Sequence, residues 1–263
     1  MTLGAALAHR LRELARGPSP LLVASDLDGT LAPIVPRPED ARVPPATLAA
    51  LERLAQVAHV AVVTGRDLAT ARALVPVAGV EFVASHGHEA SFDTATLPTS
   101  GATLAEQLEG LARSVEARLE GTTLRVERKA RSVAFHYRGD AALARPLREA
   151  LAELPEGFRL QPGRLVLEVL PAGAGKDAAL AALVERFRPG SLLVLGDDLT
   201  DVAMLEAARH LAGEGLHVLA LAIEGGVETP PEVVAAGDAV IGQEQVEGVF
   251  GLLTGTLGSP HPS

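Results

Sequence analysis

Short apolar runs alternate with helix-like segments toward both ends of the chain, and this alternation constrains the fold more than any other feature. The runs are rich in Leu, Val and Ala and end in polar, Gly-containing turns. Such an order is typical of a parallel α/β sheet with helices on its faces. Strands are predicted over residues 21–25, 59–64, 81–85, 191–195, 216–222 and 238–241, and helices over 45–56, 67–74, 176–187 and 201–212.

The middle of the chain has a different order of predicted elements. A helix over 102–119 precedes two strand-like runs in TTLRVERKARSVAFHYRG, and a helix over 141–154 precedes two more in GFRLQPGRLVLEVLP. The order αββαββ favours an antiparallel sheet with both helices on one face.

We therefore expect two domains, an α/β core and an inserted α+β domain. The core comprises residues 1–98 and 172–263, and the insert comprises 99–171. Gly- and Pro-containing linkers are predicted where the insert leaves and rejoins the core, at Pro98–Gly101 and Pro171–Gly175.

Composition narrows the class of protein and of ligand. The 263 residues contain 48% hydrophobic side chains but few aromatic ones, and no apolar stretch is long enough to span a membrane. The N-terminal MTLGAALAHRLRELARG is predicted to be a short amphipathic surface helix rather than an export signal. A net charge of −10 argues against nucleic acid or an anionic membrane as partner, but not against a small phosphorylated ligand. We expect a cytoplasmic protein that is monomeric.

Two carboxylates stand two residues apart where the first predicted strand ends, in VASDLDGTLAP. Asp26 and Asp28 would leave the carboxyl end of that strand on the same face, which is where ligands bind in open parallel sheets. Two such groups repel each other unless they share a cation or one is protonated. Because the chain has no cysteine, a metal would be held by oxygen or imidazole, and Mg²⁺ suits carboxylates.

Other segments bring complementary groups to the same sheet edge. The run HVAVVTGR ends in Thr64, Gly65 and Arg66, which offer a hydroxyl and N–H groups at the start of a helix. Lys176, one of only two lysines in the chain, begins another predicted helix. The segment LLVLGDDLTDVAM adds three carboxylates, Asp197, Asp198 and Asp201. Helix capping alone would need only one of them, so a divalent metal site is the better interpretation.

These groups fit phosphoryl transfer to Asp26. Mg²⁺ and Lys176 would offset charge on the transferred phosphoryl group, which Thr64 would orient. Asp26 would form an aspartyl phosphate, and Asp28 would protonate the leaving alcohol and then activate water.

The motifs DLDGTL, TGR, Lys176 and GDDLTD, in this order, resemble the four motifs of the haloacid-dehalogenase superfamily of phosphohydrolases. Within it, VASHGHE, VERKARSVAFHYR and LVLEVLPAGAGK are similar to the trehalose-6-phosphate phosphatase family. The resemblance implies a Rossmann-like core with an αββαββ cap. It also implies that Asp26, the backbone carbonyl of Asp28, and Asp197 bind Mg²⁺, with Asp198 and Asp201 in support.

The same resemblance places sugar-binding residues on the cap. The positions that match are Glu127, Lys129, Arg138 and Glu168. Without it, they would be read as polar faces of cap strands. The roles of His86, His88 and His136 stay open, and Gly175, Asp177 and Val202 depart from the family pattern without removing a catalytic group.

The resulting expectation is a Mg²⁺-dependent phosphatase that releases trehalose and phosphate from trehalose 6-phosphate, with the cap closing over the sugar. One alternative is a phosphatase of the same fold acting on sucrose phosphate or mannosyl-phosphoglycerate. Another is a non-hydrolytic phosphosugar-binding or phospho-acceptor module.

Overall fold

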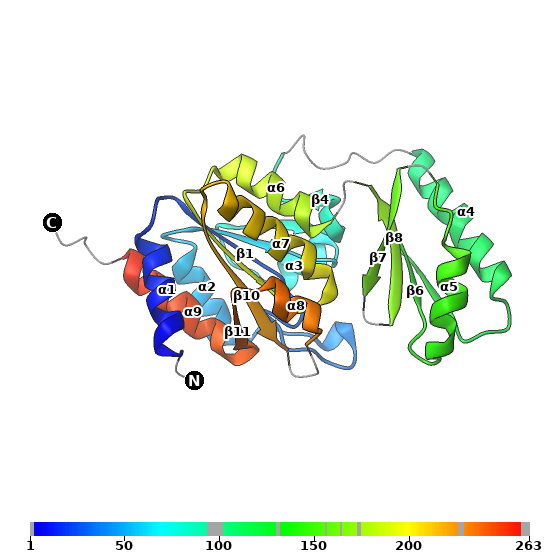
Figure 1. The fold of residues 1–263 in the computed structure, drawn as a ribbon, viewed down its shortest axis with the longest axis horizontal. Coiled ribbons are helices and arrows are strands. Elements are labelled where there is room, and N and C mark those ends of the chain that lie inside the picture. The colour runs from blue at the N-terminus through cyan, green and yellow to red at the C-terminus, as the bar shows by residue number, and fades with distance from the viewer. Residues whose placement is uncertain are drawn as a thin grey trace. The chain divides into compact units, whose positions relative to one another are not determined.

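The chain forms two compact units in the computed structural model, and the larger is built around a seven-stranded sheet (Figure 1). The structure describes residues 3–93, 102–129, 132–155, 157–163, 165–172, 175–225 and 229–258. The larger unit comprises Met1–Thr96 with Gly175–Ser263, and the smaller comprises Leu97–Ala174. The predicted linker at 98–101 lies outside the described residues, as do residues 173 and 174 of the second linker.

The strand order of the larger sheet is β11-β10-β9-β1-β2-β3-β4. Every neighbouring pair is parallel except β3 and β4. The inner strands are buried almost throughout, as expected for a sheet covered on both faces. The strands are β1 (Leu21–Ser25), β2 (His59–Val63), β3 (Val80–Ala84), β4 (Glu89–Ala90), β9 (Ser191–Gly196), β10 (His217–Glu224) and β11 (Ala239–Gly242).

Helices cover both faces of this sheet. On one face, α1 (Ala5–Arg16), α2 (Pro45–Leu54), α3 (Leu68–Leu74) and α9 (Val246–Leu257) share a hydrophobic core with the strands. On the other lie α6 (Lys176–Phe187), α7 (Leu199–Gly213) and α8 (Pro231–Ala236), which pack on one another and on the inner strands. Among the described helices, none is long and apolar enough to cross a bilayer.

The smaller unit is an antiparallel sheet with two helices, in the predicted order αββαββ. Its strands β5 (Arg125–Arg128), β6 (Val133–His136), β7 (Phe158–Gly163) and β8 (Val166–Pro171) lie in the order β5-β6-β8-β7. Alternate residues, such as Phe135 and Leu167, pack with α4 (Ala102–Arg118) and α5 (Ala144–Ala150) on one face. The predicted fold class, a Rossmann-like parallel core with an inserted α+β unit, is confirmed.

Some predicted bounds differ from the structure. The helix expected over 141–154 is an α-helix only from Ala144 to Ala150, with a 3₁₀ turn, Ala141–Leu143, before it. Pro146 explains the late start, because it has no N–H to donate to the carbonyl of Ala142. The two-residue strand β4 and the six-residue helix α8 were not predicted, since both are too short to show a period.

Candidate active site

The predicted catalytic segments converge on the central strand of the larger sheet. From β1 the chain adds β2 and β3 on one side and later β9, β10 and β11 on the other, so the strand order reverses at β1. In open α/β sheets such a switch point, at the carboxyl ends of the strands, is where ligands bind. Asp26 follows β1, Thr64 follows β2 and Asp197 follows β9, so all three lie at this edge.

Three buried carboxylates gather there. Asp26, Asp197 and Asp201 each offer an oxygen, and the three oxygens lie within 4.8 Å of one another. Burial, with the nearby charge of Asp201, raises the pKa of Asp26 to about 7. Burial and the charges of Asp26 and Asp201 raise the pKa of Asp197 to about 10. The cluster therefore holds more negative charge than its protein surroundings offset.

Lys176 is the cation within the cluster. It is the first residue of α6, and its Nζ donates to Asp26 Oδ1 at 2.5 Å and to Asp201 Oδ1 at 2.6 Å. Although burial disfavours the ammonium, Asp201 and Asp26 together raise the pKa of Lys176. Lys176 is thus held charged between two carboxylates, in contact with the group predicted to attack phosphorus.

Asp198 and Asp201 also build the start of α7. Asp198 is the N-cap and accepts the N–H of Leu199, while Asp201 Oδ2 accepts the N–H groups of Asp197 and Asp198, both at 3.1 Å. Since the other oxygen of Asp201 faces Lys176, both of its oxygens are engaged. This geometry favours a supporting role for Asp201, as the family resemblance implied.

Asp28 is paired with Arg66. Arg66 Nε donates to Asp28 Oδ2 at 2.6 Å, and Arg66 Nη2 donates to Asp28 Oδ1 at 2.7 Å and to the carbonyl of Pro38 at 2.9 Å. The hydrogen bonds to Asp28 raise the pKa of Arg66. Arg66, predicted to contribute to a phosphate site, thus has its side chain engaged by the carboxylate predicted to act as acid and base, a pairing that the sequence did not reveal.

The turn after Asp28 packs against Asp197. Gly29 has φ +90°, and a Cβ there would fall 1.9 Å from Asp197 Oδ2. Thr30 is buried and its hydroxyl donates to Asp197 Oδ1 at 3.3 Å. Gly29 thus allows the segments that follow β1 and β9 to approach each other closely, and this approach brings the carboxylates of the acidic cluster together.

The turn Thr64–Arg66 lies beside these groups. Thr64 is buried, and its Oγ1 accepts the N–H of Arg66 at 3.2 Å, which leaves the hydroxyl hydrogen able to donate to a ligand. Gly65 leaves room for the ring of His86, because a Cβ would fall 2.5 Å from that ring. The Thr64 hydroxyl is thus present at the predicted position, and Gly65 allows the turn to pack closely against the ring of His86.

The four residues predicted on the cap belong to the smaller unit. Glu127 lies across from Ala134 on β6, which lies across from Glu168 on β8, so both carboxylates are on the sheet face opposite the helices. Lys129 Nζ donates to Glu168 Oε1 at 3.0 Å. Arg138 is exposed in the turn after β6.

Sequence reasoning missed two polar residues on this face, Ser132 and Gln161, and left the role of a third, His136, open. Ser132 Oγ donates to Glu168 Oε1, and His136 Nε2 lies 2.8 Å from Glu127 Oε2. Gln161 lies across from Glu168 on β7 and is buried. The alternation of each strand was a signal for these positions, but it becomes specific only once the register is known.

The donor set at the larger sheet suits a hard divalent cation. The buried cluster offers only carboxylate oxygens, with the Thr30 hydroxyl next to one of them. Two of its carboxyl groups have raised pKa values, so a cation there would relieve a repulsion already present. The residues present therefore fit a metal ion.

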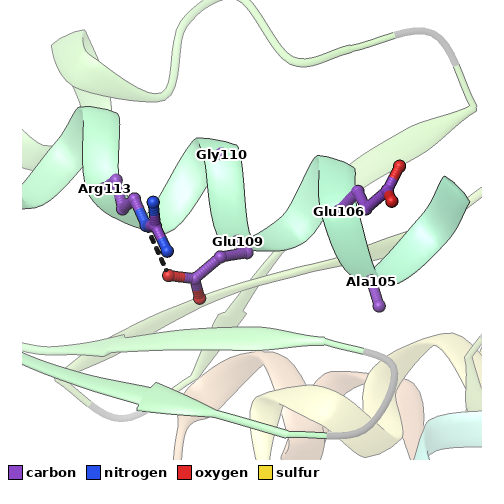
Figure 2. A pocket seen from close by; sticks show the side chains of 5 residues that line it. All are labelled: Ala105, Glu106, Glu109, Gly110 and Arg113. Atoms are coloured by element: carbon purple, nitrogen blue, oxygen red, sulfur yellow. Dashed lines mark hydrogen bonds and ion pairs between the residues drawn. The ribbon is translucent and has the colours of Figure 1, made fainter. Parts of the chain in front are cut away.

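A hollow along α4 is a different kind of feature (Figure 2). Its lining residues are Ala105, Glu106, Glu109, Gly110 and Arg113. Glu109 accepts from Arg113 at 2.7 Å, a pair one helical turn apart that is typical of a solvated helix surface. The hollow contains none of the predicted site residues.

Comparisons with known proteins agree with the motifs. The trehalose-phosphatase family matches residues 24–231. Trehalose-6-phosphate phosphatase of Escherichia coli is 30% identical over 207 residues, which are 73% of this chain and 75% of that protein. An uncharacterized glycosyl hydrolase of Mycobacterium tuberculosis is 36% identical over 230 residues, 80% of this chain. The chain spans only 17% of the length of that relative.

Solved structures share the fold. The C-terminal domain of Candida albicans trehalose-6-phosphate phosphatase has a TM-score of 0.73 and 22% identity, covering 94% of this chain and 96% of that one. A phosphatase of the haloalkanoate (HAD) superfamily from Bacteroides thetaiotaomicron has a TM-score of 0.60 and 17% identity, covering 88% and 95%. Since the family match extends over most of the sequence, the chain belongs to the trehalose-phosphatase family, within a fold shared by HAD phosphatases.

Proposed function

We propose that this protein is a Mg²⁺-dependent phosphatase that hydrolyses trehalose 6-phosphate through an aspartyl phosphate. The observation that carries the proposal is Lys176, which is buried and donates to both Asp26 and Asp201 beside Asp197 at the switch point of the sheet. A buried cation against a carboxylate nucleophile is what a site needs to bind a dianionic phosphoryl group next to it. The substrate is taken from the names of the family and its relatives.

In the first step, Asp26 attacks phosphorus. A carboxylate oxygen of Asp26 forms a bond to phosphorus while the bond from phosphorus to the sugar oxygen breaks. Asp28, in its acid form, gives its proton to the leaving oxygen. Lys176 and the Thr64 hydroxyl stabilise charge on the phosphoryl oxygens and orient the group in line.

In the second step, Asp28 acts as a base. It takes a proton from a water molecule, whose oxygen attacks phosphorus and releases Asp26. Both oxygens of Asp28 accept from Arg66, which fixes the position of the carboxyl group. Gly65 and Arg66 are proposed to contribute to the phosphate site through the turn that they form with Thr64.

Mg²⁺ is the proposed cofactor. Asp26, Asp197 and the backbone carbonyl of Asp28 would hold it, while Asp198 and Asp201 would keep those ligands aligned. When bound, the ion supplies a Lewis acid that offsets charge on the phosphoryl oxygens.

The sugar is proposed to bind to the smaller unit. Glu127, Lys129, Arg138 and Glu168 are charged donors and acceptors of the kind that select a polyol by its hydroxyl groups. Since Glu127 and Glu168 already pair with neighbours, ligand hydroxyls would exchange with His136 and Lys129 as partners of these carboxylates. We further propose that the protein acts as a cytoplasmic monomer on this small, diffusible substrate.

Phosphate release from a panel of sugar phosphates tests the function. Trehalose 6-phosphate should be the fastest substrate, chelation should abolish the activity, and Asp26→Asn should lose at least about 1,000-fold in kcat because it removes the nucleophile. Faster release from sucrose phosphate or mannosyl-phosphoglycerate would indicate that the protein is a phosphatase of that compound instead. A stable phosphoprotein with no turnover would instead indicate an acceptor module.

A further inference from the structure

The segment after β3 adopts a backbone conformation that its residues disfavour. Ser85 has φ 50° and His86 has φ 55°, and Gly87 follows with φ 91°. Left-handed conformations are uncommon for residues other than Gly, and two in succession persist only where the surroundings enforce them. The contacts that this segment makes should therefore indicate its structural role.

The segment is attached to the turn that carries Arg66. The N–H of Ser85 donates to the carbonyl of Arg66 at 2.7 Å, and the N–H of His86 donates to the carbonyl of Thr64 at 3.2 Å. The ring of His86 fills the space left open by Gly65. All three residues of the turn are thus held from one side by Ser85 and His86.

Glu89 connects this segment to the helix that follows the turn. Its Oε1 accepts the Ser85 hydroxyl at 2.6 Å, and its Oε2 accepts the N–H of Leu68, the first residue of α3, at 3.3 Å. Glu89 itself is anchored on β4, across from Ala84 on β3. One carboxylate therefore links Ser85, which holds the carbonyl of Arg66, to the start of α3 just after the turn.

We propose that Glu89 is a positioning residue for the reaction, holding the Thr64–Arg66 turn so that Arg66 orients the Asp28 carboxylate. Glu89 touches none of the reacting groups and acts through Ser85, the turn and the bidentate pair of Arg66 with Asp28. The proposal rests on the proposed phosphatase function, and it concerns the orientation of one carboxylate rather than the identity of the substrate.

This role predicts a dependence on the leaving group. A sugar alkoxide is a poor leaving group and needs the proton that Asp28 donates, whereas p-nitrophenolate leaves without one. Hydrolysis of the aspartyl phosphate also uses Asp28 but is the same for both substrates, and kcat/KM reports only the steps up to release of the leaving group. A misplaced Asp28 should therefore lower kcat/KM for sugar phosphates and leave kcat/KM for p-nitrophenyl phosphate nearly unchanged. A defect of folding or of phosphate binding would slow both.

The matched control is a second Ser–Glu pair on the same two strands. Ser91 donates to Glu81 and accepts the N–H of Phe82, next to the ladder of β3 and β4 but away from the turn. Ser91→Ala removes a similar hydrogen bond without touching Ser85 or Leu68. It should retain activity on both substrates.

Steady-state kinetics of Glu89→Ala, Glu89→Gln and Ser91→Ala carry the test. Because small displacements of catalytic groups are costly, Glu89→Ala should lose about 10- to 100-fold in kcat/KM on the sugar phosphate and about threefold or less in kcat/KM on p-nitrophenyl phosphate. Glu89→Gln keeps one acceptor oxygen and should recover part of the loss. Equal losses on both substrates, or an effect in Ser91→Ala of the same size, would overturn the proposal.

Hydrogen exchange gives a readout that does not depend on turnover. The amides of residues 64–68 should exchange several-fold faster in Glu89→Ala than in wild type, and at the wild-type rate in Ser91→Ala. Unchanged exchange in Glu89→Ala would contradict the proposal. The kinetic comparison uses the sugar phosphate that the wild-type protein hydrolyses fastest. If the protein does not hydrolyse trehalose 6-phosphate, the proposed substrate is refuted, but the role of Glu89 is still tested with the other sugar phosphate.

Discussion

The only two lysines of the chain both pair with carboxylates, but in opposite surroundings. The side chain of Lys176 is 3% exposed and lies between Asp26 and Asp201, which are 6% and 0% exposed. The side chain of Lys129 is 31% exposed, beside Glu168 at 11%. The same ionic contact is therefore part of a buried cluster in one unit, and in the other it joins a partly exposed lysine to a buried carboxylate.

Burial decides what each pair can do. Buried charges are strongly coupled and costly to separate, so Lys176 holds Asp26, the proposed nucleophile, in one geometry. A pair whose cation reaches water contributes less to stability, because water screens it and competes for the ammonium. Lys129 can consequently release Glu168 to a ligand more readily than Lys176 can release Asp26, which suits the proposed role of Lys129 and Glu168 in binding a sugar.

The largest expected effect comes from Lys176→Met, which leaves Asp26 and Asp201 buried without their cation. Breaking a buried ion pair from one side destabilises proteins by about 3–5 kcal/mol. Urea unfolding in the absence of metal measures the change. Lys129→Met is the control, and a comparable loss there would remove the contrast between the two lysines.

The loss of folding stability in Lys176→Met should depend on pH. Without the ammonium, the folded-state pKa of Asp26 rises further above its unfolded value, so the folded state binds more protons than the unfolded one. Stability then decreases as pH rises between about 4 and about 8, and the deficit should be smaller at pH 5 than at pH 8. The opposite trend would show that Lys176 does not offset these carboxylates.

The next effect is stabilisation by Mg²⁺. At pH 8, where Asp26 with its pKa of about 7 is mostly ionised, the ion should raise the melting temperature more than at pH 6, where protons compete for the same oxygens. At 100 times the dissociation constant the gain is about 2.7 kcal/mol. Thermal unfolding with and without Mg²⁺ measures it.

Two controls accompany the metal titration. Asp197→Asn removes a proposed ligand charge and should reduce the stabilisation. KCl at matched ionic strength should not reproduce it, and an equal shift with KCl would mean that the cluster responds to screening rather than to a bound ion.

The smallest effect on stability is expected for Lys129→Met, at about 1 kcal/mol or less. Its effect should fall on substrate binding: KM for trehalose 6-phosphate should rise about tenfold, the equivalent of one charged hydrogen bond. Hydrolysis of p-nitrophenyl phosphate, which lacks the sugar, should not change. An equal loss on both substrates would place Lys129 outside the sugar site.

The sequence was sufficient to predict which residues end the strands, but not which of them pair. Asp26, Thr64 and Asp197 each follow an apolar run, and the carboxyl ends of parallel strands necessarily share an edge. The ion pair of Arg66 with Asp28 joins residues 38 positions apart by a choice of side-chain rotamer. Neither periodicity nor motif spacing carries that information.

The Ser85–Glu89 segment was the least predictable part of the larger unit. Its two left-handed residues are not Gly, so composition gave no turn signal at those positions. Strand β4 is two residues long and shows no alternation. The left-handed pair depends on contacts with the Thr64–Arg66 turn and β4 depends on pairing with β3, and both exist only in the folded chain.

The two outer strands of the smaller sheet have a consequence for self-association. An uncovered strand edge can recruit a strand from another molecule and so begin aggregation. Three of the four residues of β5 are charged, Arg125, Glu127 and Arg128, and β7 contains Pro162, which has no N–H to offer. Each edge thus discourages a further strand by its own chemistry, so this small sheet can end without a covering element on either side.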